Sequence, residues 1–589
     1  RAQLRRAHSP RRGHLAADLA PRGGHPMTDW FAKHAALIER AAQANAERGA
    51  WSPFVESPSG KHHPDGAHAA GRAAFEALLG RPFSIEVPGP VGDVGGEVSP
   101  LTGEALGVTY PRGDADAIMD AARRAGAAWA DVEPAQRVGL CAELLTRWAA
   151  DVFANAYATM HTTGQGFLTA FAGSGANSLD RGLEALAMAH VAMAQVPATA
   201  DYRRAFGRGP EARLQKRYRL RPVGVAVVFA CGTYPAWNAY PAILANLACG
   251  NPVVVKPHPA TILPVAMAVR TGRDLLREAG FDANLLTLAV DTRDEPVGEH
   301  LLRHPAAAIV DFTGGQTFGA HLERAFAYLQ VYTETAGCNA VVLESADDLD
   351  AVLRAVAHGL CLFSAQMCTS PQNLWVPAEG VRTPGGVVPF EQVVSRLVAA
   401  VDAWVADPAV AAGLCGAIHD PRTQDAITAL ADEGHPVLRP SAPYAHPDFP
   451  NARTATPLIL QLDADDRALA QREHFGPMAF VIRAPDRDAA LAGATADARD
   501  HGAIASYTYT IDEAFLDRTL DAFAAAGASV GVNLVRHLPI NFTAAFSDFH
   551  VTGLNPAGTA CLTDLAFVAR RFRVVQSKVE VSGSAIPRS

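Results

Sequence analysis

Hydrophobic and polar positions form two kinds of run through the middle of the chain. Apolar runs of about four to eight residues, bounded by glycine and proline, are typical of strands buried on both faces. Longer stretches between them have apolar residues at helical spacing. Repeated strand–helix units of this length predict an α/β fold with a doubly wound parallel sheet. The predicted strands are Val223–Ala230, Pro252–Val255, Leu285–Val290 and Ala308–Phe312, and the predicted helices are Pro235–Cys249, Pro264–Ala279, Glu299–His304 and one beginning near Gln316.

The pattern changes on either side of this stretch. Upstream, Ala115–Ala130 and Ala135–Thr163 are alanine-rich amphipathic segments that predict helices with no strand between them. Residues 27–94 predict mostly helix and loop, and the first helix has Thr28 or Asp29 as its candidate N-cap. A second alternating region begins after residue 340. Its predicted strands are Ala340–Leu343, Leu374–Val376, Leu458–Leu460 and Ala479–Ile482.

Composition limits the class of protein. The 589 residues exceed what one hydrophobic core supports, and 49 % hydrophobic with 19 % charged residues excludes a disordered chain. Residues 1–26 hold six arginines and one aspartate, a net charge of +5, which leaves −14 on the rest of a chain whose total is −9. We therefore expect no nucleic-acid partner. We also expect this basic tail to be non-native or upstream of the natural start, and we leave it out of the fold.

Two further patterns concern the membrane and the cysteines. No charged residue lies between Arg221 and Lys256, but prolines and glycines interrupt this stretch too often for a membrane-spanning helix. The eight cysteines include no C-x-x-C pair and no cluster with His at zinc spacing. We therefore expect no membrane partner, no bound metal, and reduced thiols in a cytoplasmic protein.

Two loops at predicted strand ends are candidates for binding a phosphate-bearing ligand. The first follows the valines at 253–255 and carries Lys256 and His258. The second runs from Phe312 to Gly319, where Gly314 and Gly315 precede a helix and would let backbone amides approach a pyrophosphate. Taken alone, each has a common structural explanation: a solvated edge lysine and a tight turn. The dinucleotide fingerprint G-x-G-x-x-G is absent.

A cysteine and a glutamate are candidates for catalysis. Cys368 lies in a loop of small residues before the strand predicted at Leu374, and a single cysteine of this kind is more often a small buried hydrophobe. Glu334 precedes it by 34 residues and is flanked by apolar residues. An isolated glutamate in such a place is either a paired structural carboxylate or a general base.

Together these motifs resemble those of the aldehyde dehydrogenase superfamily, from about Gly95 to residue 560. The resemblance implies a nicotinamide-binding sheet, an α/β catalytic domain and a small β oligomerisation arm. It implies that Cys368 is the nucleophile and Glu334 the general base that hydrolyses the thioester. The implied coenzyme-binding residues are Lys256 and His258 in the adenosine-ribose loop, Thr313, Gly314, Gly315 and Phe318 in the pyrophosphate loop, and Glu473 and Phe475 at the nicotinamide ribose.

The chain departs from the family at the asparagine that binds the oxyanion, which normally lies in a P-W-N-F-P turn. Spacing from Pro222 and Lys256 puts Thr233 at this position, whereas Asn238 lies five residues later in a P-A-W-N sequence. Either residue could serve; the chemistry favours the asparagine amide and the spacing favours Thr233. The terminal family signature is poorly kept between His550 and Gly558.

A second departure concerns the choice of coenzyme. Members that prefer NAD usually have a glutamate three residues after the lysine, where this chain has Pro259. Without that carboxylate a 2′-phosphate meets no repulsion, and Lys256 or His258 could pair with it. We therefore expect NADP to be preferred, with NAD possible.

These departures are similar to those of one branch of the superfamily, the PaaN-type proteins of phenylacetate degradation. The implied substrate is a small-molecule aldehyde carried as a coenzyme A thioester, 3-oxo-5,6-dehydrosuberyl-CoA semialdehyde, which is oxidised to a carboxylate. Two alternatives stay open: a dehydrogenase that transfers the acyl group to coenzyme A, and a scaffold with weakened catalysis.

The expected organisation combines these inferences. We expect a basic tail (1–26), a helical extension (27–94), an NAD(P)-binding domain (95–332), a catalytic domain (333–545) and a C-terminal segment that contributes to an arm (546–589). Gln215–Leu220 and residues 571–582 are the candidate arm strands. Their alternating apolar residues would leave an exposed edge in a monomer, so we expect a homodimer or tetramer.

Overall fold

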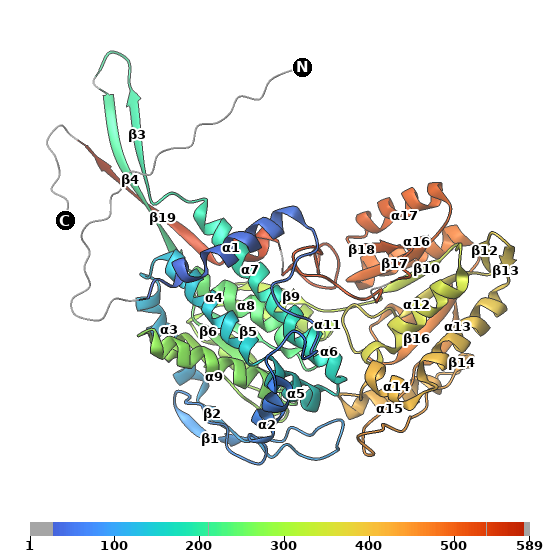
Figure 1. Cartoon of the computed structure of the whole chain (residues 1–589). Helices are drawn as coiled ribbons and strands as arrows, with labels where there is room; N and C mark the ends of the chain where they lie inside the picture. Colours follow the sequence, from blue (N-terminus) through green and yellow to red (C-terminus); the bar gives the residue numbers. More distant parts are fainter. Residues whose placement is uncertain (1–27, 210, 537–538, 563, 582–589) are drawn as a thin grey trace.

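The computed structural model describes residues 28–209, 211–536, 539–562 and 564–581. The basic tail at 1–26 and the last predicted arm residue, Ser582, lie outside these ranges. Two open sheets, each covered by helices, form the body of the molecule, and a third sheet projects from it as an arm (Figure 1).

The first sheet has five parallel strands in the order β7-β6-β5-β8-β9. It confirms the predicted strand–helix alternation and adds β9, which the sequence pattern had not predicted. Its elements are β5 (Val225–Phe229), α8 (Pro235–Cys249), β6 (Val253–Lys256), α9 (Leu263–Glu278), η2 (Ala283–Leu285), β7 (Leu286–Leu288), α10 (Gly298–Arg303), β8 (Ala307–Thr313), α11 (Gln316–Ala325) and β9 (Gln330–Glu334).

Both faces of this sheet are covered, which explains why its central strand β5 is apolar throughout. Alternate residues of β5 enter different clusters. Ala226 and Val228 pack with the helices α4, α7, α8 and α9, while Val225 and Val227 pack on the opposite face with α3 and α10. Among these covering helices, α3 spans Ala115–Trp129, α4 spans Pro134–Ala150 and α7 spans Asn177–Ala194.

The second sheet has seven strands in the order β14-β15-β16-β11-β10-β17-β18, all parallel except the β14–β15 pair. The four strands predicted after residue 340 are confirmed as β10, β11, β15 and β16. The strands are β10 (Ala340–Leu343), β11 (Asn373–Pro377), β14 (Val437–Arg439), β15 (Leu458–Asp463), β16 (Met478–Ala484), β17 (Ala505–Tyr509) and β18 (Ser529–Val532), and the hairpin β12 (Val381–Thr383)–β13 (Gly386–Val388) lies beside them. The helices of this part are α12 (Leu349–Cys361), η3 (Leu362–Ala365), α13 (Phe390–Val405), α14 (Pro408–Cys415), α15 (Pro421–Ala431), η4 (Ala468–Gln471), α16 (Arg487–His501) and α17 (Glu513–Ala525).

The helical layer upstream of the first sheet differs from the prediction in one respect. The segment 135–163, predicted as one helix, is broken at Asp151 into α4 and α5 (Val152–Thr163). The break turns the chain so that α5 packs on α2 (Ala67–Glu76) and α9. The first helix, α1 (Trp30–Glu47), begins as expected: the Asp29 side chain accepts a hydrogen bond from the Ala32 amide at 3.0 Å. The remaining elements of this part are β1 (Pro90–Val94), β2 (Tyr110–Gly113), α6 (Phe167–Phe171) and η1 (Ala172–Ala176).

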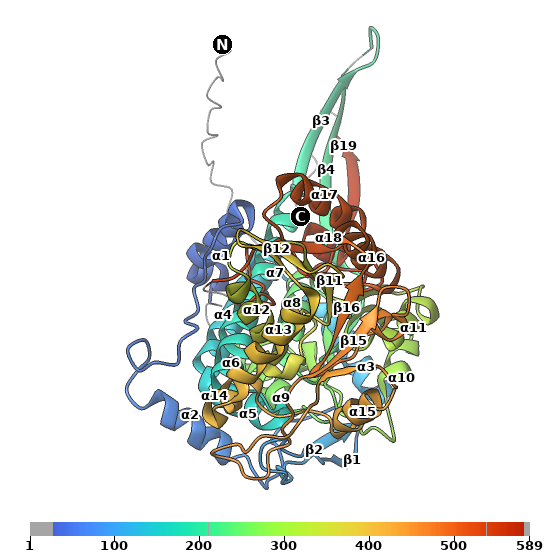
Figure 2. The same ribbon diagram turned by 90° about the vertical axis from the view of Figure 1, so that its right-hand side faces the viewer.

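The arm is a three-stranded antiparallel sheet in the order β19-β4-β3. Its strands are β3 (Thr199–Ala205), β4 (Glu211–Pro222) and β19 (Phe572–Glu580), so both segments predicted as arm strands are strands and pair with each other. After α18 (Leu565–Ala569) the C-terminal segment returns to the first sheet and enters this arm. Both views show the arm extending away from the body (Figures 1 and 2).

The apolar segment before Lys256 is divided between β5, α8 and β6. Within the described residues no single helix has the length and apolarity needed to cross a membrane. One bent pair, Phe390–Val405 with Pro408–Cys415, meets the length and composition test across a bend of 98°.

Candidate active site

A cavity of about 790 Å³ lies where the carboxyl ends of the first sheet's strands meet the second sheet. Cys231 follows β5, Thr313 ends β8 and Glu334 ends β9, and all three line it. Ligands bind at this edge of open α/β sheets, because the loops that follow the strands converge there. Cys368, Asn238, Thr233, Glu473 and His550 line the same cavity.

The loop that carries Cys368 follows three buried residues with left-handed backbone. Phe363, Ser364 and Ala365 have φ values of 48°, 50° and 51°. Such a conformation costs a non-glycine residue about 1–2 kcal/mol, so the surroundings must hold it in place. The Ser364 hydroxyl donates to the Cys415 carbonyl at 3.1 Å, and the Gln366 side-chain Nε2 donates to the Ala417 carbonyl at 3.0 Å.

Glu334 is held at the end of β9 by the C-terminal segment. Glu334 forms a bridge with Gly558, and the neighbouring Thr335 amide donates to the Ala557 carbonyl at 2.7 Å. The Glu334 side chain is 1 % exposed, and its Oε1 lies 3.9 Å from the Cys368 sulfur. The structure therefore brings together the two residues predicted as nucleophile and general base, 34 positions apart in the sequence.

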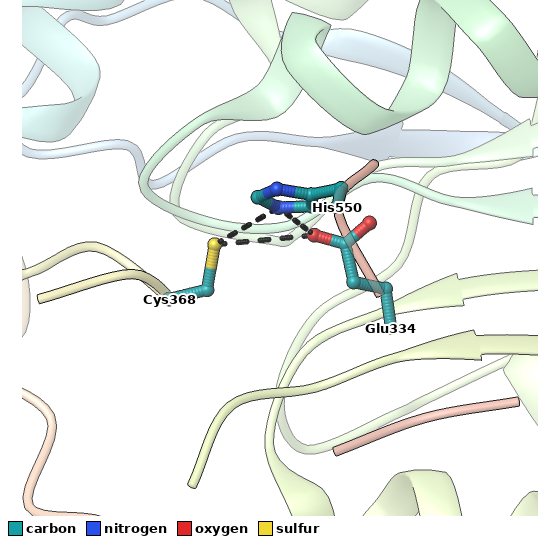
Figure 3. Close-up of side chains that lie close together, drawn as sticks. All are labelled: Glu334, Cys368 and His550. Carbon is teal, nitrogen blue, oxygen red and sulfur yellow. Dashed lines mark hydrogen bonds and ion pairs between the residues drawn. The ribbon is translucent and has the colours of Figure 1, made fainter. Parts of the chain in front are cut away.

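A third side chain, His550, completes this group (Figure 3). Its Nε2 lies 2.8 Å from Glu334 Oε1 and 3.6 Å from the Cys368 sulfur. The Cys368 sulfur, a carboxylate oxygen of Glu334 and a ring nitrogen of His550 all lie within 4.8 Å of one another. In the sequence His550 is only the first residue of a poorly kept signature, and no role is predicted for it.

The electrostatic surroundings oppose ionisation of the nucleophile. Burial raises the pKa of the Cys368 thiol well above its ordinary value, and the nearby Glu334 carboxylate raises it further. Cys231 and Glu473 act in the same direction with smaller effects. Because the thiolate is the reactive form, this site needs a compensating positive charge or a proton acceptor.

Neither candidate for the oxyanion has a side-chain hydrogen bond to a described residue. Asn238 lies on α8 and is 5 % exposed; its side chain makes no hydrogen bond to any described residue and its Oδ1 is buried without a partner. Thr233 lies in the preceding loop, where its carbonyl accepts from the Gln165 side chain at 2.6 Å. Both line the cavity. An amide that is buried, unpaired and at the wall of a cavity is suited to receive a ligand atom.

The residues predicted for the pyrophosphate and the nicotinamide ribose fit a coenzyme at this edge. Thr313, Gly314 and Gly315 line the cavity, and Gly315 is the N-cap of α11, with open space where a Cβ would stand. Glu473 and Phe475 also line it. Burial raises the pKa of Glu473 to about 7, and its carboxylate has no hydrogen-bond or ion-pair partner among the described residues. An unpaired carboxylate of this kind suits a pair of ribose hydroxyls.

Of the other three predicted coenzyme residues, only His258 is among the described lining residues. Lys256 is not among the described lining residues; its Nζ lies 2.7 Å from Oδ1 of the buried Asp291. His258 lines the cavity, but burial and nearby cations lower its pKa to about 3, so its ring is neutral at physiological pH. Phe318 is 37 % exposed and packs against Phe312, also outside the lining residues described.

Two further cavity residues had no signal in the sequence. His419 packs beside Gly232, where a Cβ would lie only 2.7 Å from the His419 Nε2, so this loop needs glycine. Asn541 lines the cavity with both side-chain polar atoms buried and unpaired among the described residues. Both residues reach the site from distant parts of the chain, and neither lies in a recognisable motif.

Comparison with known proteins shows which family the chain matches. Residues 96–544 match the model of the aldehyde dehydrogenase family. N-succinylglutamate 5-semialdehyde dehydrogenase of Burkholderia mallei is 29 % identical over 286 residues, which are 47 % of this chain and 55 % of that protein. The matched region thus spans about half the length of the curated relatives.

Solved structures match over a greater length. A crystal structure of an NAD-dependent aldehyde dehydrogenase from Burkholderia multivorans is 42 % identical, with a TM-score of 0.92 over 95 % of this chain and 100 % of that one. A 1-pyrroline-5-carboxylate dehydrogenase of Thermus thermophilus is 18 % identical, with a TM-score of 0.69 over 90 % of this chain and 100 % of that one. The second likeness concerns the fold alone.

Proposed function

The chain belongs to the aldehyde dehydrogenase family, and on this premise we propose that it oxidises an aldehyde to a carboxylate with a nicotinamide coenzyme, through a thioester on Cys368. The observation that carries the proposal is the contact between the Cys368 sulfur and Glu334, 3.9 Å apart in a cavity shared with the predicted coenzyme loops. A scaffold protein would need neither residue in this arrangement.

Each residue at the cavity has a distinct task in this mechanism. The Cys368 thiolate attacks the aldehyde carbon and forms a thiohemiacetal. The amide of Asn238 donates to the developing oxyanion, and Thr233 is the alternative donor. Glu473 and the amides near Gly315 hold the coenzyme, which when bound supplies the hydride acceptor. Glu334 then takes a proton from water, which attacks the thioester and releases the carboxylate from the sulfur.

The presence of Glu334 favours hydrolysis over transfer of the acyl group to coenzyme A. A carboxylate 3.9 Å from the sulfur is close enough to activate a water that attacks the acyl carbon carried on that sulfur. The experiment that distinguishes the two reactions measures product in the absence and presence of free coenzyme A. We expect carboxylate to form at the same rate in both, whereas a reaction that requires coenzyme A would overturn hydrolysis.

We infer that NAD is the working coenzyme, against the preference for NADP expected from Pro259. The expected cation, Lys256, is paired with the buried Asp291 at 2.7 Å, and His258 is neutral. Both observations reduce the positive charge available to a 2′-phosphate. The Burkholderia multivorans protein, described as NAD-dependent, supports the same choice.

For the substrate, we propose a long aldehyde, with the CoA-linked ring-opened semialdehyde of phenylacetate degradation as the specific candidate from the resemblance. Leu168, Trp237 and Phe542 give the cavity an apolar wall that suits a carbon chain. Among the lining residues that the structure describes, the one Lys or Arg is Arg422, which pairs with Asp420 at 2.6 Å. The phosphates of coenzyme A would therefore remain outside the cavity.

A substrate series tests this assignment. We expect kcat/KM to rise with chain length in straight-chain aldehydes and to be highest for the CoA-linked semialdehyde. Equal values for that compound and for the same semialdehyde without coenzyme A would show that only the chain is recognised. Absence of activity with every member, in a protein that binds NAD, would contradict the proposed oxidation itself.

A further inference from the structure

His550 is buried against the two residues that the proposed function makes catalytic. Its side chain is 2 % exposed, and Figure 3 shows its ring above both the Cys368 sulfur and the Glu334 carboxylate. The same ring nitrogen, Nε2, faces both partners, at 3.6 Å and 2.8 Å. The other ring nitrogen, Nδ1, is buried without a hydrogen-bond partner among the described residues. A histidine in a merely structural role more often has its ring nitrogens bonded to backbone groups.

The fold holds His550 from both sides. Upstream, the buried Arg181 guanidinium donates to the Asp548 carbonyl at 3.0 Å and to the Ala544 carbonyl at 3.1 Å. Downstream, the Thr559 amide donates to the Thr333 carbonyl at 3.0 Å. At Gly558 a Cβ would lie 2.3 Å from that carbonyl, so glycine permits the close approach. The C-terminal segment is therefore pinned to β9, the strand that carries Glu334.

The charges around the site leave the Cys368 thiolate in need of a stabilising group. Cys231, Glu334 and Glu473 all raise the pKa of the Cys368 thiol, as does burial. A cation behind His550, Arg181, lies 5.2 Å from the Trp237 ring, and this ring lies 6.0 Å from the imidazole. Among the described residues only His550 can place a positive charge directly beside the sulfur. A neighbouring imidazolium stabilises a thiolate.

We propose that His550 is a third catalytic residue, which accepts the thiol proton of Cys368 at Nε2 and holds it against Glu334. The S–H bond breaks, an N–H bond forms, and the electron pair stays on the sulfur, which then attacks the aldehyde carbon. The buried imidazolium lies between two negative groups, the new thiolate and the carboxylate 2.8 Å away, and the proton transfer leaves the net charge of the three groups unchanged. This proposal deepens the proposed function and rests on it for the identity of the nucleophile.

The test measures the reactivity of Cys368 without aldehyde or coenzyme. Full-length protein is alkylated with iodoacetamide between about pH 5 and 10, the modified cysteine is located by peptide mass, and Cys368→Ala marks the background. In His550→Gln we expect alkylation of Cys368 at pH 7 to be at least about tenfold slower, with its pH dependence moved to higher pH. His358→Gln is the matched control, because this histidine packs against Trp404 away from the cavity. Its profile should equal that of the wild type.

The outcomes separate the two proposals. An unchanged pH profile in a folded His550→Gln protein would overturn the role of His550 and leave the proposed oxidation intact. A shifted profile in an enzyme that oxidises no aldehyde would do the reverse. If His550→Gln does not fold, His550→Asn gives the same readout, and circular dichroism with a thermal melt establishes that the variant is native. A wild-type profile in folded His550→Asn would likewise overturn the proposal.

Discussion

Asn238 illustrates how a residue outside its expected spacing can serve the expected chemistry. The family position falls on Thr233, and both side chains stand at the cavity wall without a hydrogen bond to a described residue, but Asn238 offers the amide donor. We therefore expect Asn238→Ala to lower kcat by about 100-fold, equivalent to about 3 kcal/mol, because one oxyanion donor is lost. Thr233→Val should cost less than about tenfold. Steady-state kinetics on both variants decides, and the reverse order would assign the oxyanion to Thr233.

Glu473 makes coenzyme binding depend on pH. Burial raises its pKa to about 7, so its carboxylate becomes protonated as the pH falls through neutrality. Ribose hydroxyls donate to the ionised form, so binding at lower pH must first remove a proton. We expect the Kd for NAD to rise by about tenfold between pH 8 and pH 6, and Glu473→Gln to bind more weakly with a flat profile. Titration calorimetry measures the Kd of both proteins. The same pH dependence of Kd in the wild type and in Glu473→Gln would contradict the role of Glu473.

At the residue scale the sequence predicted the reacting pair but not its neighbour. Cys368 and Glu334 lie in recognisable motifs, and the structure brings them within 3.9 Å. His550 lies 182 positions after Cys368 in a segment with a degraded signature, so local pattern carried no information about it. Its place is set by the Arg181 contacts and the Gly558 bridge, which are long-range features of the fold.

At the scale of elements, strand ends determine the coenzyme chemistry. Lys256 ends β6, and the next strand of the sheet, β7, leads into the loop that contains Asp291. The two loops meet because neighbouring parallel strands end at the same edge of the sheet. The Asp291 carboxylate then offsets the positive charge of Lys256. The sequence around Lys256 gives no sign of this carboxylate, because Asp291 comes from the neighbouring loop.

This pairing predicts a change in coenzyme preference. Asp291→Asn leaves Lys256 without its buried partner while keeping an oxygen for the Val297 amide, which now bonds Asp291 at 3.0 Å. We expect the ratio of kcat/KM for NADP to that for NAD to rise at least about fivefold, since a freed lysine can pair with the 2′-phosphate. Asp294→Asn, an exposed aspartate of the same loop, is the control. An unchanged ratio of kcat/KM in Asp291→Asn would show that Lys256 does not determine the choice between NADP and NAD.

Element prediction succeeded for buried strands of apolar sequence and failed where polar residues interrupt the pattern, as in β17, which is buried but contains Ser506 and Thr508. The apolar strands β5, β6, β8 and β10 were found because both faces of each are covered. Strand β9, with half-exposed residues at its start and polar Thr333 and Glu334 at its end, was missed. The break at Asp151 between α4 and α5 was also missed, because alanine-rich sequence continues in a helical pattern through it.

At the scale of the whole molecule, the arm ends in an edge strand, β19, whose outer side pairs with no other described strand of the chain. In β19, Val575 and Val579 are 55 % and 40 % exposed and share one face of an edge strand. An exposed edge presents unpaired backbone groups to which another chain can pair. We propose that the arm joins subunits into a homodimer or tetramer.

Light scattering after gel filtration tests this assembly. The wild type should elute as a dimer or larger, and Val575→Glu combined with Val579→Glu should shift it towards monomer, because two charges would be buried at the interface. Gln576→Glu, which places a charge on the opposite face of the same strand, is the control. A wild-type protein that is monomeric at high concentration would exclude the role of the arm.

The central claim, a thioester on Cys368 that Glu334 hydrolyses, is tested most directly by rapid mixing of Glu334→Gln with aldehyde and coenzyme. We predict a burst of reduced coenzyme of about one per active site, followed by turnover at least about 100-fold slower than in the wild type, with the acyl group found on Cys368 by mass. The burst itself can be slower, because His550 loses its carboxylate partner. Steady-state turnover at the wild-type rate in Glu334→Gln, without an acylated cysteine, would contradict the mechanism.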